Sequence, residues 1–189
     1  MRKGNTANAR ECALSVLVAC RRNGAWADAA LKAQLGKCAL SAQDAALCSR
    51  IVYGVMQNEL LLNWYLSAYC TQKLDHLQPP LADILRIGAY QILFLDKVPN
   101  HAAVSESVEL CRMNGRSAAS GLVNAVLRKA CSYDLNTASF KNEVERLMVL
   151  GSAGRDVAEF LHKNYPDEAL DILTYKADGG ITSLRANPL

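Results

Sequence analysis

The chain has 189 residues, of which 51% are hydrophobic and 6% aromatic, and 21 Lys and Arg residues against 18 Asp and Glu give it a net charge of +3. This apolar content argues against disorder and suffices for the core of one ordinary domain, with room for an appendage. Few aromatic residues and only five prolines beside long Ala- and Leu-rich stretches argue against an all-β fold and predict an all-α one.

The first 40 residues predict two helices. Residues 6–22 carry apolar side chains at three- and four-residue steps, a pattern typical of a helix with one buried face. Arg10 and Arg21 fall outside that apolar stripe. A short second helix is expected over residues 26–35, with Gly36 ending it.

The longest periodic segment begins at Ser41. Asp44 follows three residues later, which resembles a capping box with Asp in place of the usual Glu. Apolar residues then keep a helical register as far as Tyr69. We expect one long helix here, long enough to be the central one, with a bend near Gly54 or Asn58.

Pro79 and Pro80 stop that helix and favour the start of the next one. The segment that follows, LADILRIGAYQILFLD, is apolar on most sides, so we expect a deeply buried helix. Gly88 in its middle costs about 1 kcal/mol relative to alanine. A close crossing with another helix at Gly88 would explain the glycine.

Two further helices are predicted before residue 131. Asn100 opens the first, and Gly115 closes it, with three charged side chains turned outward, namely Glu106, Glu109 and Arg112. The second covers LVNAVLRKAC, with four apolar residues expected on the core side, namely Leu122, Val123, Val126 and Leu127.

The character of the chain changes after Cys131. Residues 134–189 hold six basic and nine acidic residues, a net charge of −3, whereas residues 1–40 hold seven basic and two acidic residues, a net charge of +5. Helices are expected at about 139–150, 155–164 and 167–177. The final nine residues, ITSLRANPL, are expected to begin an extended strand.

The usual catalytic, metal and cofactor motifs are missing from the sequence. The seven cysteines include no C-x-x-C pair, so we interpret them as small core residues in a reducing compartment. The three histidines are scattered, and no G-x-G-x-x-G follows a predicted strand. A Cys111–His101 nucleophile pair is rejected, because ten residues along one helix place them on different turns. We therefore expect no catalytic residue, no metal and no bound cofactor in this chain.

The N-terminus superficially resembles an export signal, because MRK precedes an apolar run that ends in LVAC. About eight consecutive apolar or small residues are at the lower limit for such a signal, and two arginines follow at once. An amphipathic helix explains the same residues. No segment approaches the ~20 apolar residues of a membrane span, so we expect a cytoplasmic protein without a membrane partner.

The basic residues are more informative than the net charge. Arg2, Lys3 and Arg10 cluster before and within the first helix, and Arg112 and Arg116 flank a glycine-containing loop that leads to another helix start. Arginines beside the backbone N–H groups of a helix start form a phosphate-binding surface. The alternative is that all five are ordinary solubilising charges.

Linked motifs over residues 8–131 resemble a known family. The run ILRIGAYQILFLDKVPNHAAVSESVELCR, followed by GLVNAVLRKA, resembles the NusB-like domain. The forms HAAV-x-E-x-VEL and VNAVLR are closer to the N-terminal domain of the bacterial 16S ribosomal RNA cytosine-5 methyltransferases, the RsmB (Sun or Fmu) family, than to free-standing NusB. Ser105 departs from this pattern, which commonly has Asn at that position. The tail also fits, because SLRANPL resembles the LR-x-N strand that begins the next part of those enzymes.

The resemblance implies an all-α NusB-like bundle over residues 1–133 and a helical linker over residues 134–178. Residues 179–189 would then begin an RNA-binding and methyltransferase part that is missing from a truncated chain. S-adenosylmethionine and the two catalytic cysteines of the family would belong to that missing part. The resemblance also implies that Arg86 and Asn124 belong to family motifs, and we interpret both as helix-packing hydrogen-bond partners.

The implied function is recruitment of small-subunit ribosomal RNA through Arg2, Lys3, Arg10, Arg112 and Arg116. The implied partners are that RNA and the methyltransferase domain of the same protein. One alternative is a NusB-type antitermination factor that acts through RNA and a ribosomal protein. Another is a structural clamp that packs against the methyltransferase domain with little RNA affinity of its own.

Overall fold

The structure is a computed structural model that describes residues 8–175, with the side chains of Asp75 and Asn136 left aside. The prediction of an all-α fold is confirmed, because residues 8–175 contain helices and no strand. The chain divides into two compact units, Met1–Ser139 and Phe140–Leu189. The division lies six residues after the predicted boundary at residue 133.

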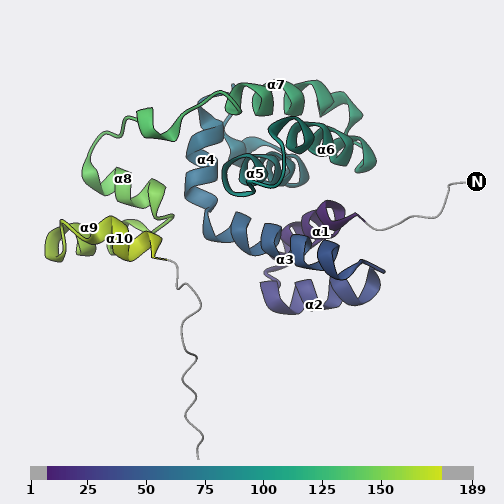
Figure 1. Ribbon diagram of the computed structural model, residues 1–189, viewed down its shortest axis with the longest axis horizontal. Helices are drawn as coiled ribbons and strands as arrows, with labels where there is room; N and C mark the ends of the chain where they lie inside the picture. Colours follow the sequence, from purple (N-terminus) through teal and green to yellow (C-terminus); the bar gives the residue numbers. More distant parts are fainter. Residues whose placement is uncertain (1–7, 176–189) are drawn as a thin grey trace, which may run out of the picture. The chain divides into compact units, whose positions relative to one another are not determined.

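Seven α-helices form the first unit within the described residues (Figure 1). They are α1 (Ala9–Asn23), α2 (Ala27–Lys37), α3 (Ala42–Gln57), α4 (Glu59–Ser67), α5 (Pro79–Phe94), α6 (Asn100–Met113) and α7 (Ser120–Ala130). Short 3-10 turns are η1 (Leu74–His76), η2 (Ser117–Ala119) and η3 (Leu135–Thr137).

Helix α5 is the central helix of this unit. It packs against α1, α3, α4, α6 and α7, and Figure 1 shows it nearly end-on with α4, α6 and α7 around it. Residues 81–91 are all buried, which confirms the expected deep burial. The prediction that the segment after Ser41 is central is wrong, because α5 is the helix that packs against five others and is buried along residues 81–91, with its polar side chains Asp83, Arg86 and Gln91 hydrogen-bonded inside the core.

The segment after Ser41 forms two helices rather than one bent helix. Ser41 caps α3, since its Oγ accepts a hydrogen bond from the Asp44 N–H at 3.1 Å, as the capping-box prediction required. The helix ends at Asn58, whose side-chain amide donates to the Gly54 carbonyl at 2.8 Å. The Asn58 backbone N–H donates to the same carbonyl at 3.1 Å, so both groups of Asn58 close the last turn of α3 and α4 begins at once in another direction.

Two other helix predictions need correction. Helix α2 continues through Gly36 to Lys37 and ends at Cys38, whose N–H donates to the Gln34 carbonyl at 3.1 Å. Leu122 was expected in the core but is 37% exposed, whereas Val123, Val126 and Leu127 are buried. Leu122 lies in the first turn of α7 and falls just outside the apolar stripe of that helix.

The close crossing predicted at Gly88 is confirmed. A Cβ atom at Gly88 would lie 2.4 Å from Cδ1 of Leu127 and 2.8 Å from Oγ of Ser107. Helices α6 and α7 therefore approach α5 at this point, which only glycine permits. This crossing fixes the positions of the two helices that carry the candidate sites.

Tyr65 is buried in the core and contacts the end of α7. Its ring lies edge-on to Tyr133 at 5.7 Å, and its hydroxyl donates to the Ala130 carbonyl at the end of α7 at 2.5 Å. Burial raises the pKa of Tyr65 to about 12. A buried phenol with a raised pKa stabilises the fold fully below its unfolded-state pKa of about 10 and loses that contribution as the pH rises toward 12.

Replacing Tyr65 by phenylalanine removes the hydroxyl and keeps the ring. We expect the free energy of unfolding to fall by about 1 kcal/mol near neutral pH, because one buried hydrogen bond disappears. The difference between the two proteins should shrink between pH 10 and pH 12, where only the wild type has this phenol to ionise. Urea denaturation at a series of pH values measures both effects. A constant difference up to pH 12 would contradict the burial of the phenol.

The second unit contains three helices within the described residues, α8 (Glu143–Leu150), α9 (Arg155–Asn164) and α10 (Ala169–Thr174). Their small core consists of Leu147, Ala158, Leu161 and Ala169. The three helices expected after residue 134 are therefore present, although α8 and α10 are shorter than predicted. The predicted strand at 181–189 lies outside the described residues. Among residues 8–175, no helix is long and apolar enough to cross a membrane.

Candidate nucleic-acid interface

The loop between α6 and α7 holds Arg116 in a fixed position. Gly115 has a φ of 70°, a left-handed conformation that favours glycine, and it follows the last helical residue, Met113, by two positions, as expected of a glycine that closes α6. The Arg116 N–H donates to the Cys111 carbonyl at 3.0 Å, and the Arg116 carbonyl accepts from the Cys111 thiol at 3.1 Å. The backbone of Arg116 is therefore tied to the last turn of α6.

The Arg116 side chain lies over the start of α5. Its Nη1 donates to Oε1 of Gln78, the residue before Pro79, and its buried Nε has no hydrogen-bond partner among the described residues. A cavity of about 460 Å³ opens beside it and is lined by both polar and apolar side chains and by the loop itself. The polar lining consists of Gln72, His76, Gln78 and Arg116. No described side chain in this lining is acidic, so the cavity suits an anionic or hydrogen-bonding ligand.

Arg112 lies one turn before this loop, at the exposed end of α6. Its Nη1 is 3.5 Å from Oε2 of Glu109, and the two side chains are 56% and 57% exposed. An ion pair this exposed contributes little and is screened by salt, so Arg112 remains available to a ligand. The outward positions predicted for Glu109 and Arg112 are confirmed.

Arg10 is already engaged within the protein. Its Nε donates to Oε1 of Gln91 on α5 at 2.7 Å, and its Nη1 lies 3.6 Å from Oε2 of Glu106 on α6. Gln91 and Gln78 are thirteen residues apart on α5, which is about 20 Å along the helix axis. The structure therefore brings Arg112 and Arg116 together and leaves Arg10 apart, holding α1 against α5 and α6. Arg2 and Lys3 lie outside the described residues.

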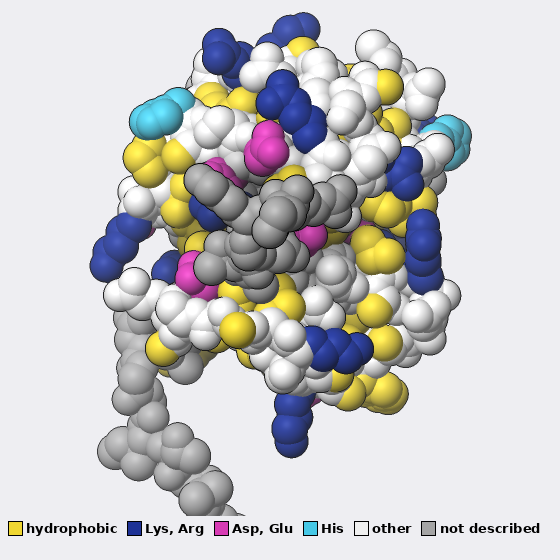
Figure 2. Space-filling model, turned by 90° about the vertical axis from the view of Figure 1, so that its right-hand side faces the viewer, with side chains coloured by type: hydrophobic (Ala, Val, Ile, Leu, Met, Phe, Trp, Pro, Cys, Tyr) yellow, Lys and Arg dark blue, Asp and Glu magenta, His cyan; other side chains and the backbone are white. Residues whose placement is uncertain are grey.

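One face of the molecule shows how its basic side chains are distributed. On the face shown in Figure 2, Lys and Arg side chains are dispersed among hydrophobic and uncharged ones. This agrees with the small net charge. An interface on this face therefore depends on a few placed side chains rather than on a wide electropositive surface.

Comparison with known proteins decides the family. The NusB family matches residues 7–132, two thirds of the chain. The chain belongs to the NusB family. The match covers the part of the first unit that runs from just before α1 to just after α7.

The relatives of this NusB-family chain include proteins named as ribosomal RNA methyltransferases and as antitermination proteins. "Probable ribosomal RNA small subunit methyltransferase B" of Bacillus subtilis is 33% identical over 119 residues, 63% of this chain and 26% of the relative. The protein of the same name from Synechocystis is 33% identical over 122 residues, 65% of this chain and 27% of the relative. The chain thus spans about a quarter of the length of these relatives. "Transcription antitermination protein NusB" of Bacillus licheniformis is 33% identical over 91 residues, 47% of this chain and 70% of the relative.

A solved structure supports the fold of the NusB-family chain. The crystal structure of PH0851 has a TM-score of 0.66 at 16% sequence identity, and the match covers 90% of this chain and 39% of PH0851. At this identity the likeness concerns the fold alone.

Most cysteines of the NusB-family chain have surroundings that disfavour the thiolate. Cys12, Cys48 and Cys111 are buried, and the other four are half-buried. Burial raises the pKa of the Cys12 thiol to about 12, with a contribution from its hydrogen bond to Cys38, and that of Cys48 to about 11. A thiolate at Cys12 or Cys48 is therefore disfavoured at neutral pH. Among residues 8–175, no cluster of three or more His, Cys, Asp or Glu side chains is arranged to hold a metal ion.

Sequence reasoning missed Gln78 and His76 as neighbours of Arg116. They precede Arg116 by 38 and 40 residues, so only the packing of α5 against α6 brings them together. The only sign of these neighbours in the sequence is the polar stretch before Pro79, and such a stretch is typical of an ordinary loop between helices. The interpretation of Arg86 as a packing residue is confirmed, because it is 3% exposed and its Nε donates to Oδ1 of Asn63 at 2.8 Å.

Proposed function

We propose that this NusB-family domain binds small-subunit ribosomal RNA and recruits it to an S-adenosylmethionine-dependent cytosine-5 methyltransferase. The observation that carries the proposal is the 33% identity, over 119 residues, to a relative named as a ribosomal RNA small subunit methyltransferase. The chain corresponds to about a quarter of that relative, so we assign cofactor binding and catalysis to the remainder of such a protein. In this proposal the chain acts in the cytoplasm and contributes RNA affinity but no catalytic group.

The geometry around Arg116 supports RNA as the ligand. The Arg116 side chain beside the cavity, the exposed Arg112 at the end of α6, and the Gln and His side chains of the cavity offer donors for phosphate and for base edges. A dispersed surface charge favours local contacts to a single-stranded segment over non-specific attraction along a duplex.

The double charge reversal of Arg112→Glu and Arg116→Glu tests the proposal. We expect the affinity for a labelled single-stranded fragment of small-subunit ribosomal RNA to fall at least tenfold, because charge-assisted hydrogen bonds are worth about 1.5 to 3 kcal/mol each. The salt dependence of log K should flatten by about 0.7 for each phosphate that the variant no longer binds. Fluorescence anisotropy titrations at several salt concentrations measure both quantities.

Arg155→Glu provides a matched control. Arg155 is 66% exposed in α9 of the second unit and pairs with Glu159 at 3.3 Å. Its reversal changes the net charge by the same amount as each of the two reversals in the double variant. We expect only a small effect of this control. A decrease of log K in the control that is half the decrease in the double variant would mean that the net charge alone matters, and no binding by the wild type would overturn the proposal.

A second candidate function is antitermination, because the chain is 33% identical to a named NusB and the match covers 70% of that protein. The expected partner is then a ribosomal protein. Purified small-subunit ribosomal proteins, mixed one at a time with the chain without RNA, would distinguish the two functions by size-exclusion chromatography. A stable equimolar complex would favour antitermination, and its absence together with RNA binding would favour the methyltransferase role.

A further inference from the structure

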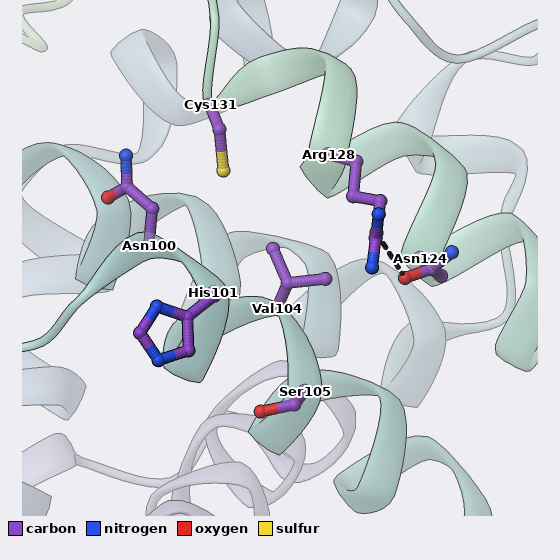
Figure 3. Close-up of a pocket in the computed structure, with 7 residues that line it drawn as sticks. All are labelled: Asn100, His101, Val104, Ser105, Asn124, Arg128 and Cys131. Atoms are coloured by element: carbon purple, nitrogen blue, oxygen red, sulfur yellow. Dashed lines mark hydrogen bonds between the residues drawn. The ribbon is translucent and has the colours of Figure 1, made fainter.

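A second polar pocket lies at the opposite end of the α6–α7 pair from Arg116. It has a volume of about 300 Å³ and lies between the first turns of α6 and the last turns of α7 (Figure 3). Its lining consists of Asn100, His101, Val104, Ser105, Asn124, Arg128 and Cys131. His101 and Arg112 are eleven residues apart on α6, about 16 Å along the helix axis. This pocket is therefore separate from the cavity beside Arg116.

Arg128 is the charged group of this pocket. Figure 3 shows it reaching from α7 toward Val104 and Ser105 of α6. Its Nε donates to Oδ1 of Asn124 at 3.1 Å, which orients the guanidinium and leaves its other N–H groups for a ligand. Among the described residues, no carboxylate pairs with Arg128, whereas Arg10 and Arg112 are each paired with a glutamate. One positive charge in the pocket is thus uncompensated.

The remaining side chains supply polar donors, a flat ring and an apolar floor. Asn124 uses its oxygen for Arg128, so its amide N–H groups remain donors. His101 is exposed and offers an aromatic ring at the edge of the pocket. Val104, only 5% exposed, forms the floor. A planar ring, one cation and amide donors around an apolar floor suit a nucleobase attached to a single phosphate.

We propose that this pocket binds one unstacked nucleotide of a single-stranded RNA. Arg128 contacts the phosphodiester, His101 stacks on the base and Asn124 donates to the base edge. The inference rests on the proposed function, RNA binding, and adds a second contact point on α6 and α7. The single uncompensated guanidinium matches the one negative charge of a phosphodiester better than the two or more charges of a free nucleotide. The described lining residues also include no carboxylate to hold a metal ion.

Three variants of the whole chain test the assignment with a labelled single-stranded RNA of about twelve nucleotides. Arg128→Gln should weaken binding about tenfold and lower the salt slope by about 0.7, because the cation that binds one phosphate is removed. His101→Ala should weaken binding about fivefold or more with an unchanged salt slope, because stacking releases no counterion. Asn124→Ala should weaken binding and reduce the effect of base identity.

Two controls isolate the pocket. Lys129→Gln removes a charge from the neighbouring exposed residue, which does not line the pocket, and should have a smaller effect than Arg128→Gln. An RNA of the same length with abasic sugars should remain sensitive to Arg128→Gln and become insensitive to His101→Ala. Circular dichroism confirms that each variant keeps its helix content.

The outcomes separate this inference from the proposed function. If the Arg112 and Arg116 reversals weaken binding while Arg128→Gln and His101→Ala behave like Lys129→Gln, the pocket assignment is overturned and the proposed function stands. Competition by a free nucleoside monophosphate as strong as that of the RNA would also overturn it. A wild-type chain that binds no RNA would overturn both.

Discussion

Replacing Arg86 by methionine is expected to lower the free energy of unfolding by up to about 3 to 5 kcal/mol, because it removes one of the two arginines that pair with a buried carboxylate. Asp83 is fully buried one turn before Arg86 on the central helix α5. Arg86 Nη1 lies 3.0 Å from Oδ1 of Asp83, and Arg86 is itself only 3% exposed. Methionine keeps much of the length of the side chain, so the change isolates the removal of the charge.

The surrounding groups cannot fully replace Arg86. Arg21 reaches from α1 and donates through Nε to the same Asp83 oxygen at 2.7 Å, but it also pairs with Glu59 at 2.8 Å. The other oxygen, Oδ2 of Asp83, has no hydrogen-bond partner among the described residues. Glu59 lies 3.8 Å from Arg86 Nη2 and would lose that attraction too. Removing one arginine therefore leaves two carboxylates to share the other.

Urea denaturation followed by circular dichroism measures the effect, and Arg112→Met is the matched control. Glu109 and Arg112 have the same i, i+3 spacing on a helix as Asp83 and Arg86, but both are more than half exposed. Their pair should contribute less than about 1 kcal/mol. Equal destabilisation of the two variants would contradict the stated role of burial.

A double variant tests the cause of the destabilisation. Replacing Asp83 by leucine together with Arg86→Met removes both buried charges and should recover much of the stability, since apolar replacement of a buried ion pair is often neutral or stabilising. A double variant that is as unstable as Arg86→Met alone would mean that poorer packing, not the unpaired charge, accounts for the effect.

Sequence reasoning identified Arg86 as a packing residue but not its partners. The pattern around residues 81–91 predicts a buried helix, and a buried arginine must then be hydrogen-bonded. Arg21 precedes Asp83 by 62 residues, and no local pattern connects them. The same limit explains Arg10, which by its sequence is a free cation on the polar side of its helix. The structure places Gln91, 81 residues further along the chain, beside its guanidinium.

The candidate site, too, was predictable from the sequence only in part. The loop at Arg116 was predictable because Asn114 and Gly115 end a periodic segment and basic residues flank them. The pocket at Arg128 was not, because its groups come from the N-terminal end of one helix and the C-terminal end of the next. The sequence favours Asn124 as a bond between helices, yet its hydrogen bond to Arg128 lies within α7. Side-chain pairs on one helix are predictable from spacing, whereas pockets between helices require their packing.

Gly54→Ala is expected to lower the free energy of unfolding by about 1 to 3 kcal/mol, although alanine favours helices over glycine by about 1 kcal/mol. A Cβ atom at Gly54 would lie 2.0 Å from Cζ of the Tyr90 ring and 2.3 Å from its hydroxyl oxygen. Tyr90 is 6% exposed and stacks on Phe94 at 5.2 Å, so the ring has little room to move. The overpacking of α3 against α5 therefore outweighs the gain in helix propensity.

Gly36→Ala is the control for this prediction, because the same substitution is expected to have the opposite effect on stability there. Gly36 also lies within a helix, but nothing comes within 4 Å of a Cβ atom placed there. The same substitution should therefore raise the free energy of unfolding by up to about 1 kcal/mol. Thermal and urea denaturation of both variants compare the two positions directly. If Gly54→Ala also stabilised the protein, the close approach of Tyr90 to α3 would be contradicted. If adding Tyr90→Ala to Gly54→Ala removed the penalty of the alanine, the clash with the ring would be identified as its cause.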